Sequence, residues 1–191
     1  MNLLANKLAD RLVRRGLDPE NKEIYAYAIE CLLNTTASFG TILIVSIILG
    51  KFILALIWMA FFFPIRQTSG GLHASNHIGC YILSISIGIG CLLINPLFVS
   101  ISWVVWPGLA ISIVVIFLFA PVIHKNHPLS RERMLRMKRS ARRIVIVESC
   151  LCAVLFFIVP AQYPIAAVLG LLSATVSTLI GHVKDLTIQI E

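Results

Sequence analysis

Apolar side chains dominate long stretches of the chain, and short groups of glycine, proline and basic residues separate these stretches. Residues 67–124 and residues 149–183 contain no Asp, Glu, Lys or Arg. Uncharged runs of this length are typical of helices that cross a membrane. The interruptions leave six apolar segments, at about 24–49, 52–65, 78–94, 98–122, 143–159 and 163–182. We therefore expect an all-α integral membrane protein with about six transmembrane helices, built as a single membrane domain over residues 1–191.

The N-terminal segment, residues 1–19, has a different pattern. Leu4, Leu8 and Leu12 follow one another at intervals of four, and basic side chains occupy the other faces. This spacing predicts an amphipathic helix at the membrane interface. A signal peptide is disfavoured because the apolar runs are too short for its hydrophobic region.

Composition agrees with this pattern. Hydrophobic residues make up 58% of the 191 residues and charged residues only 13%, about half of the ~25% share in soluble domains. A cytosolic globular enzyme and a disordered chain are excluded. The net charge of +7 does not indicate nucleic acid, because the basic residues lie mainly between apolar segments, where anionic membrane lipids are the expected partner. The five cysteines suggest no disulfide framework.

The segment 52–65 is short for a span, since its fourteen residues rise about 21 Å against a hydrocarbon core of roughly 30 Å. Charge favours a span nevertheless. If the segment crosses, fifteen of the sixteen Lys and Arg share one side and only Lys51 lies opposite, which the positive-inside rule assigns to a cytoplasmic majority. If it is re-entrant, the basic loop at 124–143 moves outside. We expect cytoplasmic termini, and irregular backbone recessed below the cytoplasmic surface at residues 66–76.

Residues 66–80 hold the densest group of reactive side chains in the sequence: one Arg, two His and one Cys at a single membrane face. Ser75 or Asn76 is a candidate N-cap for the following helix. Cys80 then falls in the first turns of that helix, where the helix dipole and a nearby cation favour the thiolate form. The residues alone leave two interpretations open: Cys80 is a nucleophile, or both histidines are interfacial polar residues and Cys80 is a packing residue.

A nucleophilic cysteine needs a base within hydrogen-bond reach. His77 is a helical neighbour of Cys80, because residues at i and i+3 adjoin on a helix surface. His73 reaches the thiol only if the chain folds back before the helix, which the Gly70-Gly71 pair permits. Geometry alone thus favours His77 and leaves His73 open.

Arg66, Gly71, His73 and Cys80 follow an apolar span with the spacing R-x4-G-x-H-x6-C. This pattern resembles the motif of the accessory gene regulator protein B (AgrB) family of bacterial quorum-sensing peptidases. Residues 121–129, PVIHKNHPL, are similar to the family's P-x4-N-x-P-L stretch, and the chain length and six-span hydropathy also fit. The resemblance implies a cysteine endopeptidase of the bacterial cytoplasmic membrane with its active site on the cytoplasmic side. Its substrate would be a short amphipathic propeptide with an acidic C-terminal tail, which it cleaves and closes into a cyclic thiolactone or lactone.

The resemblance assigns the nucleophile to Cys80 and the base to His73, in place of His77. Arg66 and Gly71 match the motif as supporting positions, together with the adjacent Gly70. Arg66 is a candidate to stabilise the oxyanion, to lower the pKa of Cys80, or to hold a propeptide carboxylate through its planar fork. The alternative for Arg66 is an ordinary positive anchor at the membrane boundary.

Three basic residues of the loop, Arg136, Lys138 and Arg139, are candidates to capture the acidic tail of a propeptide. The alternative is that the loop only fixes orientation and binds anionic lipid. Glu30 or Glu148 is a candidate to orient His73 as a third member, with salt bridging to the basic loop as the alternative.

Other function classes compete with a cysteine peptidase. His73 and His77 have the spacing of a zinc pair, but the Glu of H-E-x-x-H is missing, so we expect no metal and no cofactor. A metal-dependent intramembrane protease and a small transporter or channel subunit are the alternatives, although the spans carry few ionisable groups beyond Glu30 and Glu148. A second copy of the chain is a further candidate partner.

Overall fold

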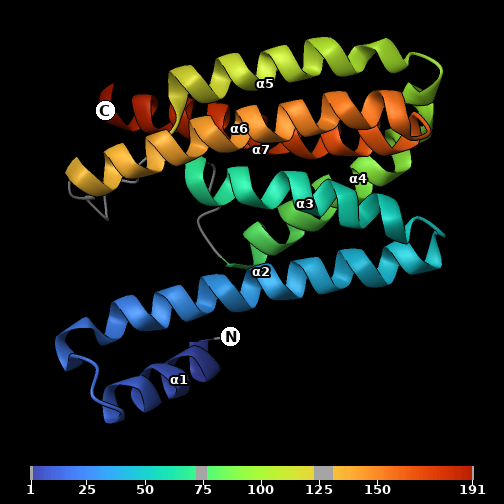
Figure 1. Cartoon of the computed structure of the whole chain (residues 1–191). Coiled ribbons are helices and arrows are strands. Elements are labelled where there is room, and N and C mark those ends of the chain that lie inside the picture. Colours follow the sequence, from blue (N-terminus) through green and yellow to red (C-terminus); the bar gives the residue numbers. More distant parts are fainter. Residues whose placement is uncertain (1, 72–76, 123–130, 191) are drawn as a thin grey trace.

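The computed structural model describes residues 2–71, 77–122 and 131–190, and over these residues it consists of helices joined by short turns (Figure 1). The elements in chain order are α1 (Asn2–Arg14), the 3-10 helix η1 (Pro19–Asn21), α2 (Lys22–Ile48), α3 (Phe52–Ser69), α4 (His77–Val99), the 3-10 helix η2 (Ser102–Val104), α5 (Val105–Phe119), α6 (Arg131–Ile158) and α7 (Gln162–Ile190). The predicted all-α architecture is confirmed.

Within the described residues, five helices are long and apolar enough to cross a membrane, judged by length and composition: α2 with η1, α3, α4, α5 with η2, and α7. α6 is not among them, since its apolar half carries Arg142, Arg143 and Glu148. The outer faces expose large apolar side chains, of which Ile48 and Phe157 are 79% and 77% accessible. Such a surface is suited to lipid, and the chain is a multi-pass membrane protein. A sixth span at 143–159 stays a prediction.

α3 extends four residues beyond the predicted segment 52–65 and remains helical through Pro64 to Ser69. A proline inside a membrane helix is tolerated where hydroxyl side chains satisfy the backbone, and Thr68 Oγ1 donates to the Pro64 carbonyl at 2.9 Å. The eighteen residues of α3 rise about 27 Å, close to the thickness of the hydrocarbon core. The expectation of irregular backbone from Arg66 onward is therefore wrong: Arg66 is helical, and the helix ends only before Gly70.

α6 begins at Arg131, inside the region expected to be a basic loop. Its first half consists mainly of Arg and Lys with some Met, Leu and Ala, and all of these residue types are good helix formers. α4 likewise continues through Pro96 to Val99, past the break expected near residue 95. The start of α6 therefore follows intrinsic propensity, whereas α4 continues past Pro96 against it.

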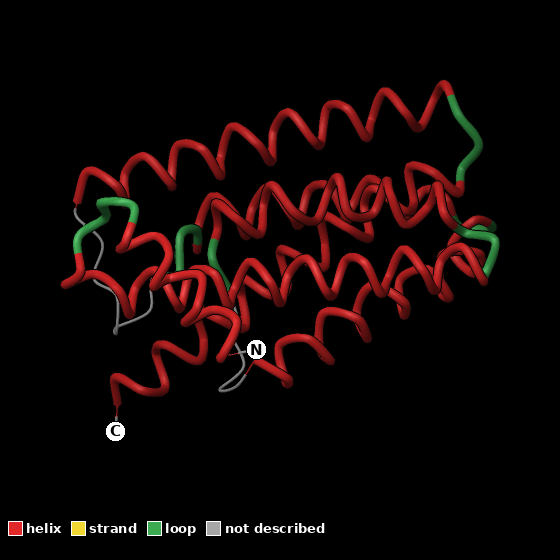
Figure 2. The backbone as a smooth tube through the Cα atoms, turned by 90° about the horizontal axis from the view of Figure 1, so that it is seen from below, coloured by secondary structure: helices red, strands yellow, loops and turns green. Residues whose placement is uncertain are grey.

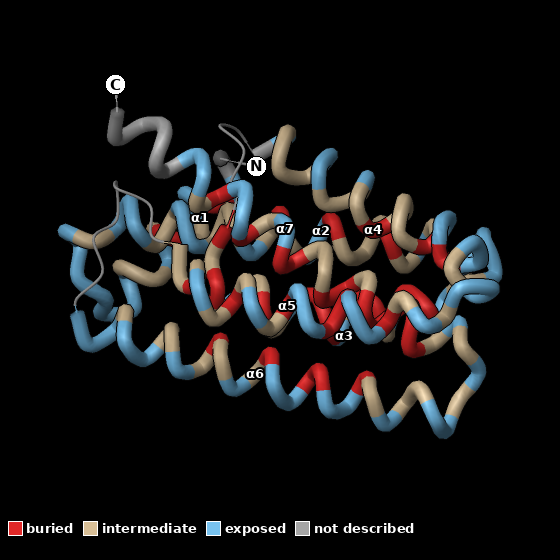
Figure 3. Tube along the Cα trace, turned by 90° about the horizontal axis from the view of Figure 1, so that it is seen from above, coloured by how far each residue is buried: buried red, intermediate tan, exposed pale blue. Residues whose placement is uncertain are grey.

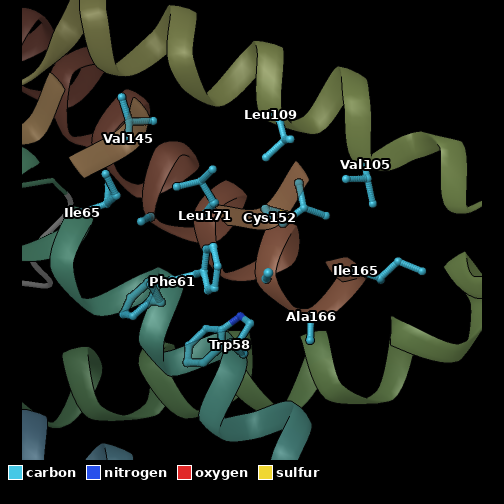
Figure 4. Packing of buried hydrophobic residues seen from close by; sticks show 14 of the residues in the cluster. Trp58, Phe61, Ile65, Val105, Leu109, Val145, Cys152, Ile165, Ala166 and Leu171 are labelled. Carbon is cyan, nitrogen blue, oxygen red and sulfur yellow. The ribbon is translucent and has the colours of Figure 1, made fainter. Parts of the chain in front are cut away.

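α7 is the central helix and packs against α3, α4, α5 and α6. The buried positions in Figure 3 accordingly gather on α7, α3 and α5. Small residues permit close approach between membrane helices, and a methyl group on Gly170 would lie 2.4 Å from the Trp58 carbonyl oxygen of α3. Figure 4 shows Trp58 and Phe61 of α3 beside Leu171 in this core. The α3 and α7 pairing thereby fixes where α3 ends.

α1 and α2 lie at the edge of the bundle (Figure 1). α1 packs on α2 through fully buried Ala5 and Ala9, and Asp10 pairs with Lys22 at 2.7 Å. Leu4 stays 53% exposed, so part of the predicted leucine stripe remains available to the membrane interface. The buried residues of α2 are mostly polar: Asn34, Ser38, Ile42 and Ser46.

The bundle has two ends (Figures 1 and 2). The α2–α3, α4–α5 and α6–α7 connections gather at one end, which we call the Lys51 end. The end of α3, the start of α4, the start of α6 and the C-terminus lie at the other, which we call the Gly70 end. The predicted reactive segment therefore belongs to the Gly70 end.

Candidate active site

Cys80 lies in the first turn of α4, which begins at His77. This agrees with the predicted helical position, and it leaves the thiol within the positive field of a helix N-terminus. The side chain is half-buried, and the backbone carbonyl of Cys80 accepts a hydrogen bond from Ser84 Oγ at 2.9 Å. The candidate N-caps Ser75 and Asn76 lie outside the described residues, as does His73.

The neighbours of Cys80 come from α2 and α3. Tyr27 and Cys31 of α2 are hydrogen-bonded to each other, and both lie within electrostatic range of the Cys80 thiol. Arg66 of α3 is within the same range. Next to Cys80, the Tyr81 hydroxyl is hydrogen-bonded to Thr41 Oγ1 at 2.8 Å, which ties α4 to α2. The half-buried Cys80 thiol is therefore influenced by residues of both α2 and α3.

Arg66 folds back over the end of its own helix. Its Nη1 donates a hydrogen bond to the Gly70 carbonyl, one of the backbone acceptors that a helix C-terminus leaves without an internal partner. The side chain is half-buried, and the same Nη1 lies 2.9 Å from the position that a Cβ would take on Gly71. Arg66, Gly70 and Gly71 thus form one compact turn, and its guanidinium interacts electrostatically with Cys80.

Both glycines of this turn are required by its geometry. Gly70 has φ +70° and Gly71 has φ +129°, values that side-chain-bearing residues rarely adopt. A Cβ on Gly70 would lie 2.5 Å from the Val122 carbonyl oxygen, and a Cβ on Gly71 would lie 2.9 Å from the carbonyl oxygen and Oγ of Ser177. The turn is therefore wedged between the segment after α5 and α7.

α7 contributes to the site although the sequence did not identify it. Ser69 Oγ is hydrogen-bonded to Thr178 Oγ1 at 2.8 Å, and Thr178 Oγ1 in turn donates to the Ala174 carbonyl at 3.0 Å. The Val122 amide donates to the Ser69 carbonyl at 2.9 Å. These bonds anchor the end of α3. A signal was present, since Ser173 and Ser177 are four residues apart and such small polar residues mark helix contacts in membranes.

The two candidate carboxylates occupy different surroundings. Glu30 is half-buried on α2, directly before Cys31 and within electrostatic range of that thiol. Glu148 lies in the buried face of α6, which packs on α3, α5 and α7, and its Oε2 has no hydrogen-bond partner among the described residues. A role of either in orienting His73 stays a prediction because His73 is outside the described residues.

The candidate basic residues are helical rather than part of a loop. Arg136 and Arg139 are exposed on one face of α6, one turn apart, and exposed Arg143 continues this stripe. Lys138 is half-buried and lies about 200° around the helix from Arg136. The helix therefore places Lys138 on a different face from Arg136 and Arg139, which could not be seen while these residues were expected to lie in a loop.

An apolar groove of about 270 Å³ runs between α4 and α7. Leu83 and Ile87 line it from α4, and Val176 and Ser177 from α7. Ser177 also contacts Gly71, and Leu83 follows Cys80 by three residues. The groove thus adjoins the candidate active site.

Metal ligation has limited support in the part of the chain that is described. Among the side chains that the structure describes, which do not include those of His77 and Asp185, no three of His, Cys, Asp or Glu come close enough to hold an ion. His73, His124 and His127 lie outside the described residues.

The chain is similar to known proteins over most of its length. The Accessory gene regulator B family model matches residues 4–179. A Clostridium perfringens (strain 13 / Type A) protein named "Putative AgrB-like protein 2" is 32% identical over 153 residues, covering 76% of this chain and 70% of that protein. A "Putative AgrB-like protein" of Clostridium perfringens (strain SM101 / Type A) is 30% identical over the same shares. A protein of that name from Listeria innocua is 25% identical over 142 residues, covering 72% of this chain and 70% of that protein. No solved structure matches. The chain therefore belongs to the Accessory gene regulator B family, and with it to the membrane components of the accessory gene regulator quorum-sensing system.

Proposed function

We propose that the chain is a membrane cysteine endopeptidase that cleaves a short autoinducer propeptide and promotes its cyclisation to a thiolactone or lactone. The observation that carries the proposal is the position of Cys80 in the first turn of α4, near Arg66 and the Gly70-Gly71 turn. Family membership supports it, because the family takes part in autoinducer peptide processing.

The first half of the proposed reaction is acyl transfer to the enzyme. The Cys80 thiolate attacks a peptide carbonyl carbon of the propeptide, and the C–N bond of that peptide breaks. His73, assigned by the motif, passes its proton to the departing amine. The N-terminal part of the propeptide stays on Cys80 as a thioester, and the C-terminal fragment leaves.

The second half closes the ring. A cysteine or serine side chain of the retained peptide gives its S–H or O–H proton to His73 and attacks the thioester carbonyl, and the bond to Cys80 Sγ breaks, which regenerates the thiolate. Water would compete by hydrolysing the thioester, so exclusion of water favours cyclisation. The half-buried setting of Cys80 against α2 and α3 supports this selectivity.

Arg66 has the proposed role of stabilising negative charge. Its bond to the Gly70 carbonyl holds the planar guanidinium near Cys80. Charged donors that are fixed in place before reaction stabilise an oxyanion without reorganisation. We assign Arg66 to the oxyanion of the tetrahedral intermediate, and the alternative, binding of a propeptide carboxylate, would affect KM more than kcat.

The proposed substrate is an amphipathic peptide held at the membrane. The groove between α4 and α7 suits an apolar stretch of such a peptide, because Leu83 and Ile87 line it within two turns of Cys80. The exposed stripe of Arg136, Arg139 and Arg143 suits an acidic tail. Cytoplasmic placement of this end of the bundle belongs to the same proposal.

The experiment is cleavage of short peptides encoded beside this chain's reading frame, co-expressed with it and followed in isolated membranes. Cys80→Ser and His73→Ala should abolish cleavage while the protein stays inserted, and His77→Ala should keep substantial activity. Cys91→Ser is the matched control, because it removes another thiol from the same helix. Full cleavage by Cys80→Ser would refute the proposal, and loss only in His77→Ala would reassign the base. Thiol alkylation should inactivate the enzyme and chelation should not.

A further inference from the structure

A second, larger hollow lies at the Lys51 end of the bundle. Its volume is about 670 Å³, and residues from the α2–α3 turn, the last turns of α4 and the start of α7 line it. Ile47, Leu49, Ile53 and Val99 make part of its wall apolar, and none of the described residues that line it is acidic. It is separate from the Cys80 site, which belongs to the Gly70 end.

Lys51 supplies a positive charge at this hollow. Pro96 has no backbone N–H, so the Leu92 carbonyl of α4 lacks the hydrogen bond that a helix normally gives it. Lys51 Nζ donates to this carbonyl at 2.7 Å. An ammonium group carries three donors, and this bond uses one of them. The charge is therefore held in place at the edge of the hollow rather than free in solution.

The first turn of α3 adds backbone donors. Lys51 is the N-cap of α3, and its side chain makes no capping hydrogen bond. Phe52, Ile53 and Leu54, the first three residues of the helix, all line the hollow. Their N–H groups have no partner within the helix, and the helix dipole makes this terminus attractive to an anion.

Asn95 is an independent sign that the hollow accommodates a polar ligand. Its side chain is 1% exposed and lines the hollow, and its Nδ2 donates to the Gln162 carbonyl at 2.9 Å. Its Oδ1 is buried and has no hydrogen-bond partner among the described residues. A buried acceptor left unpaired costs free energy, which a ligand hydroxyl would offset.

We propose that this hollow binds a phosphate-bearing anion that also carries a hydroxyl donor, and specifically the headgroup of an anionic phospholipid such as phosphatidylglycerol. Lys51 and the first turn of α3 bind the phosphate, and Asn95 accepts from a headgroup hydroxyl. The apolar part of the wall accommodates the beginning of the acyl chains. Free phosphate shares the charge but not the apolar part.

The test measures binding of phosphatidylglycerol to the full chain purified in an uncharged detergent, by native mass spectrometry, with phosphatidylcholine and inorganic phosphate as the comparison probes. Val99→Glu puts a carboxylate into the hollow without touching the bond between Lys51 and Leu92. It should weaken phosphatidylglycerol binding roughly tenfold or more, because like charges repel at close range. Ile101→Glu is the matched control outside the hollow, and it should leave binding within about twofold.

Lys51→Gln and Lys51→Arg complete the series. Arg should preserve binding and Gln should lose it, which separates the charge from mere packing. Binding of inorganic phosphate to the parent chain but not to Val99→Glu would show that the phosphate group alone is sufficient for binding, and it would support the site. Equal binding of phosphatidylglycerol and phosphatidylcholine would overturn the proposal, as would equal phosphatidylglycerol binding by the parent chain and Val99→Glu.

Discussion

Gly71 lies directly against Ser177 of α7, so that a methyl group on Gly71 would come within 2.9 Å of both the carbonyl oxygen and Oγ of Ser177. The same methyl group would lie 2.9 Å from Arg66 Nη1. Packing therefore explains why residue 71 is a glycine: the turn brings the Arg66 guanidinium close to α7 only if residue 71, which lies between them, has no side chain.

Gly71→Ala should consequently reduce propeptide cleavage by at least ~10-fold while the protein remains inserted, because the positive φ alone costs about 1–2 kcal/mol and relief of the clash displaces Arg66. Cleavage assayed in membranes at matched protein levels measures the effect. Gly90→Ala is the control, since a Cβ there meets nothing within 4 Å. Full activity of Gly71→Ala would show that the turn does not position Arg66 for catalysis.

The anchor between α3 and α7 should be measurable as a coupling. Ser69→Ala and Thr178→Val each remove one side of the hydroxyl pair, and each should lower the thermal midpoint of the protein in detergent. A double-mutant cycle should give a coupling of about 0.5–1.5 kcal/mol, the usual net value of a hydrogen bond. Strictly additive effects would mean that the two hydroxyls do not stabilise each other.

Lys51 and Pro96 should be coupled in stability. Lys51→Met leaves the Leu92 carbonyl without a donor, and this should cost about 1–3 kcal/mol. In a Pro96→Ala background, residue 96 regains a backbone N–H that can reach this carbonyl, so the same Lys51→Met change should cost much less. Thermal unfolding of the four proteins measures this. An equal cost in both backgrounds would contradict the assigned role of the ammonium.

Membrane topology can be tested at two exposed positions. Cysteines introduced at Ile101 and Leu135, in a chain without its native cysteines, should be labelled from opposite sides of the membrane, because the predicted span α5 lies between them. An impermeant maleimide applied to whole cells distinguishes the sides. Labelling of both from one side would contradict a membrane crossing by α5, and with it the predicted placement of Lys51 on the side opposite the termini.

The basic stripe on α6 should act through capture of substrate. Arg136→Gln should raise the apparent KM about fivefold, the equivalent of roughly 1 kcal/mol for one charge near a surface, with little change in kcat. Lys138→Gln removes the same charge from another face of the helix and should change KM less. The Arg136 effect should shrink at high salt. Equal effects of the two substitutions would favour general attraction to the membrane over a defined stripe.

Much of the fold was predictable because lipid makes one strong demand: apolar residues must continue for the length of a span. The all-α membrane architecture follows from that demand, and the candidate N-caps Ser75 and Asn76 predicted Cys80 in the first turns of α4. The apolar pattern did not predict where several helices begin or end. Arg131 and its basic neighbours form a helix because of their propensity, and α3 and α4 continue through Pro64 and Pro96 instead of ending there.

The candidate site was predictable only along its own segment. Arg66, Gly70, Gly71 and Cys80 are close in sequence, and their spacing predicts that they act together. Ser177 and Thr178 were missed because they lie over a hundred residues from Ser69, and only the packing of α7 on α3 brings them to the turn. Tyr27 and Cys31 were missed because only the packing of α2 on α4 brings them toward Cys80.

Proline and charge are linked in this chain in a way that bears on its orientation. Arg142 Nη2 donates at 2.9 Å to the Phe117 carbonyl in the last turn of α5, and Lys51 Nζ likewise donates to the carbonyl four residues before Pro96 in α4. Translocating a basic residue to the far side of a membrane is disfavoured, and Lys51 is the single predicted case. Pro96 gives Lys51 a structural role at this position, because the Leu92 carbonyl has no amide donor within α4 and the Lys51 ammonium takes its place. The other Lys and Arg are predicted on the opposite side, so one basic residue here does not reverse the charge bias.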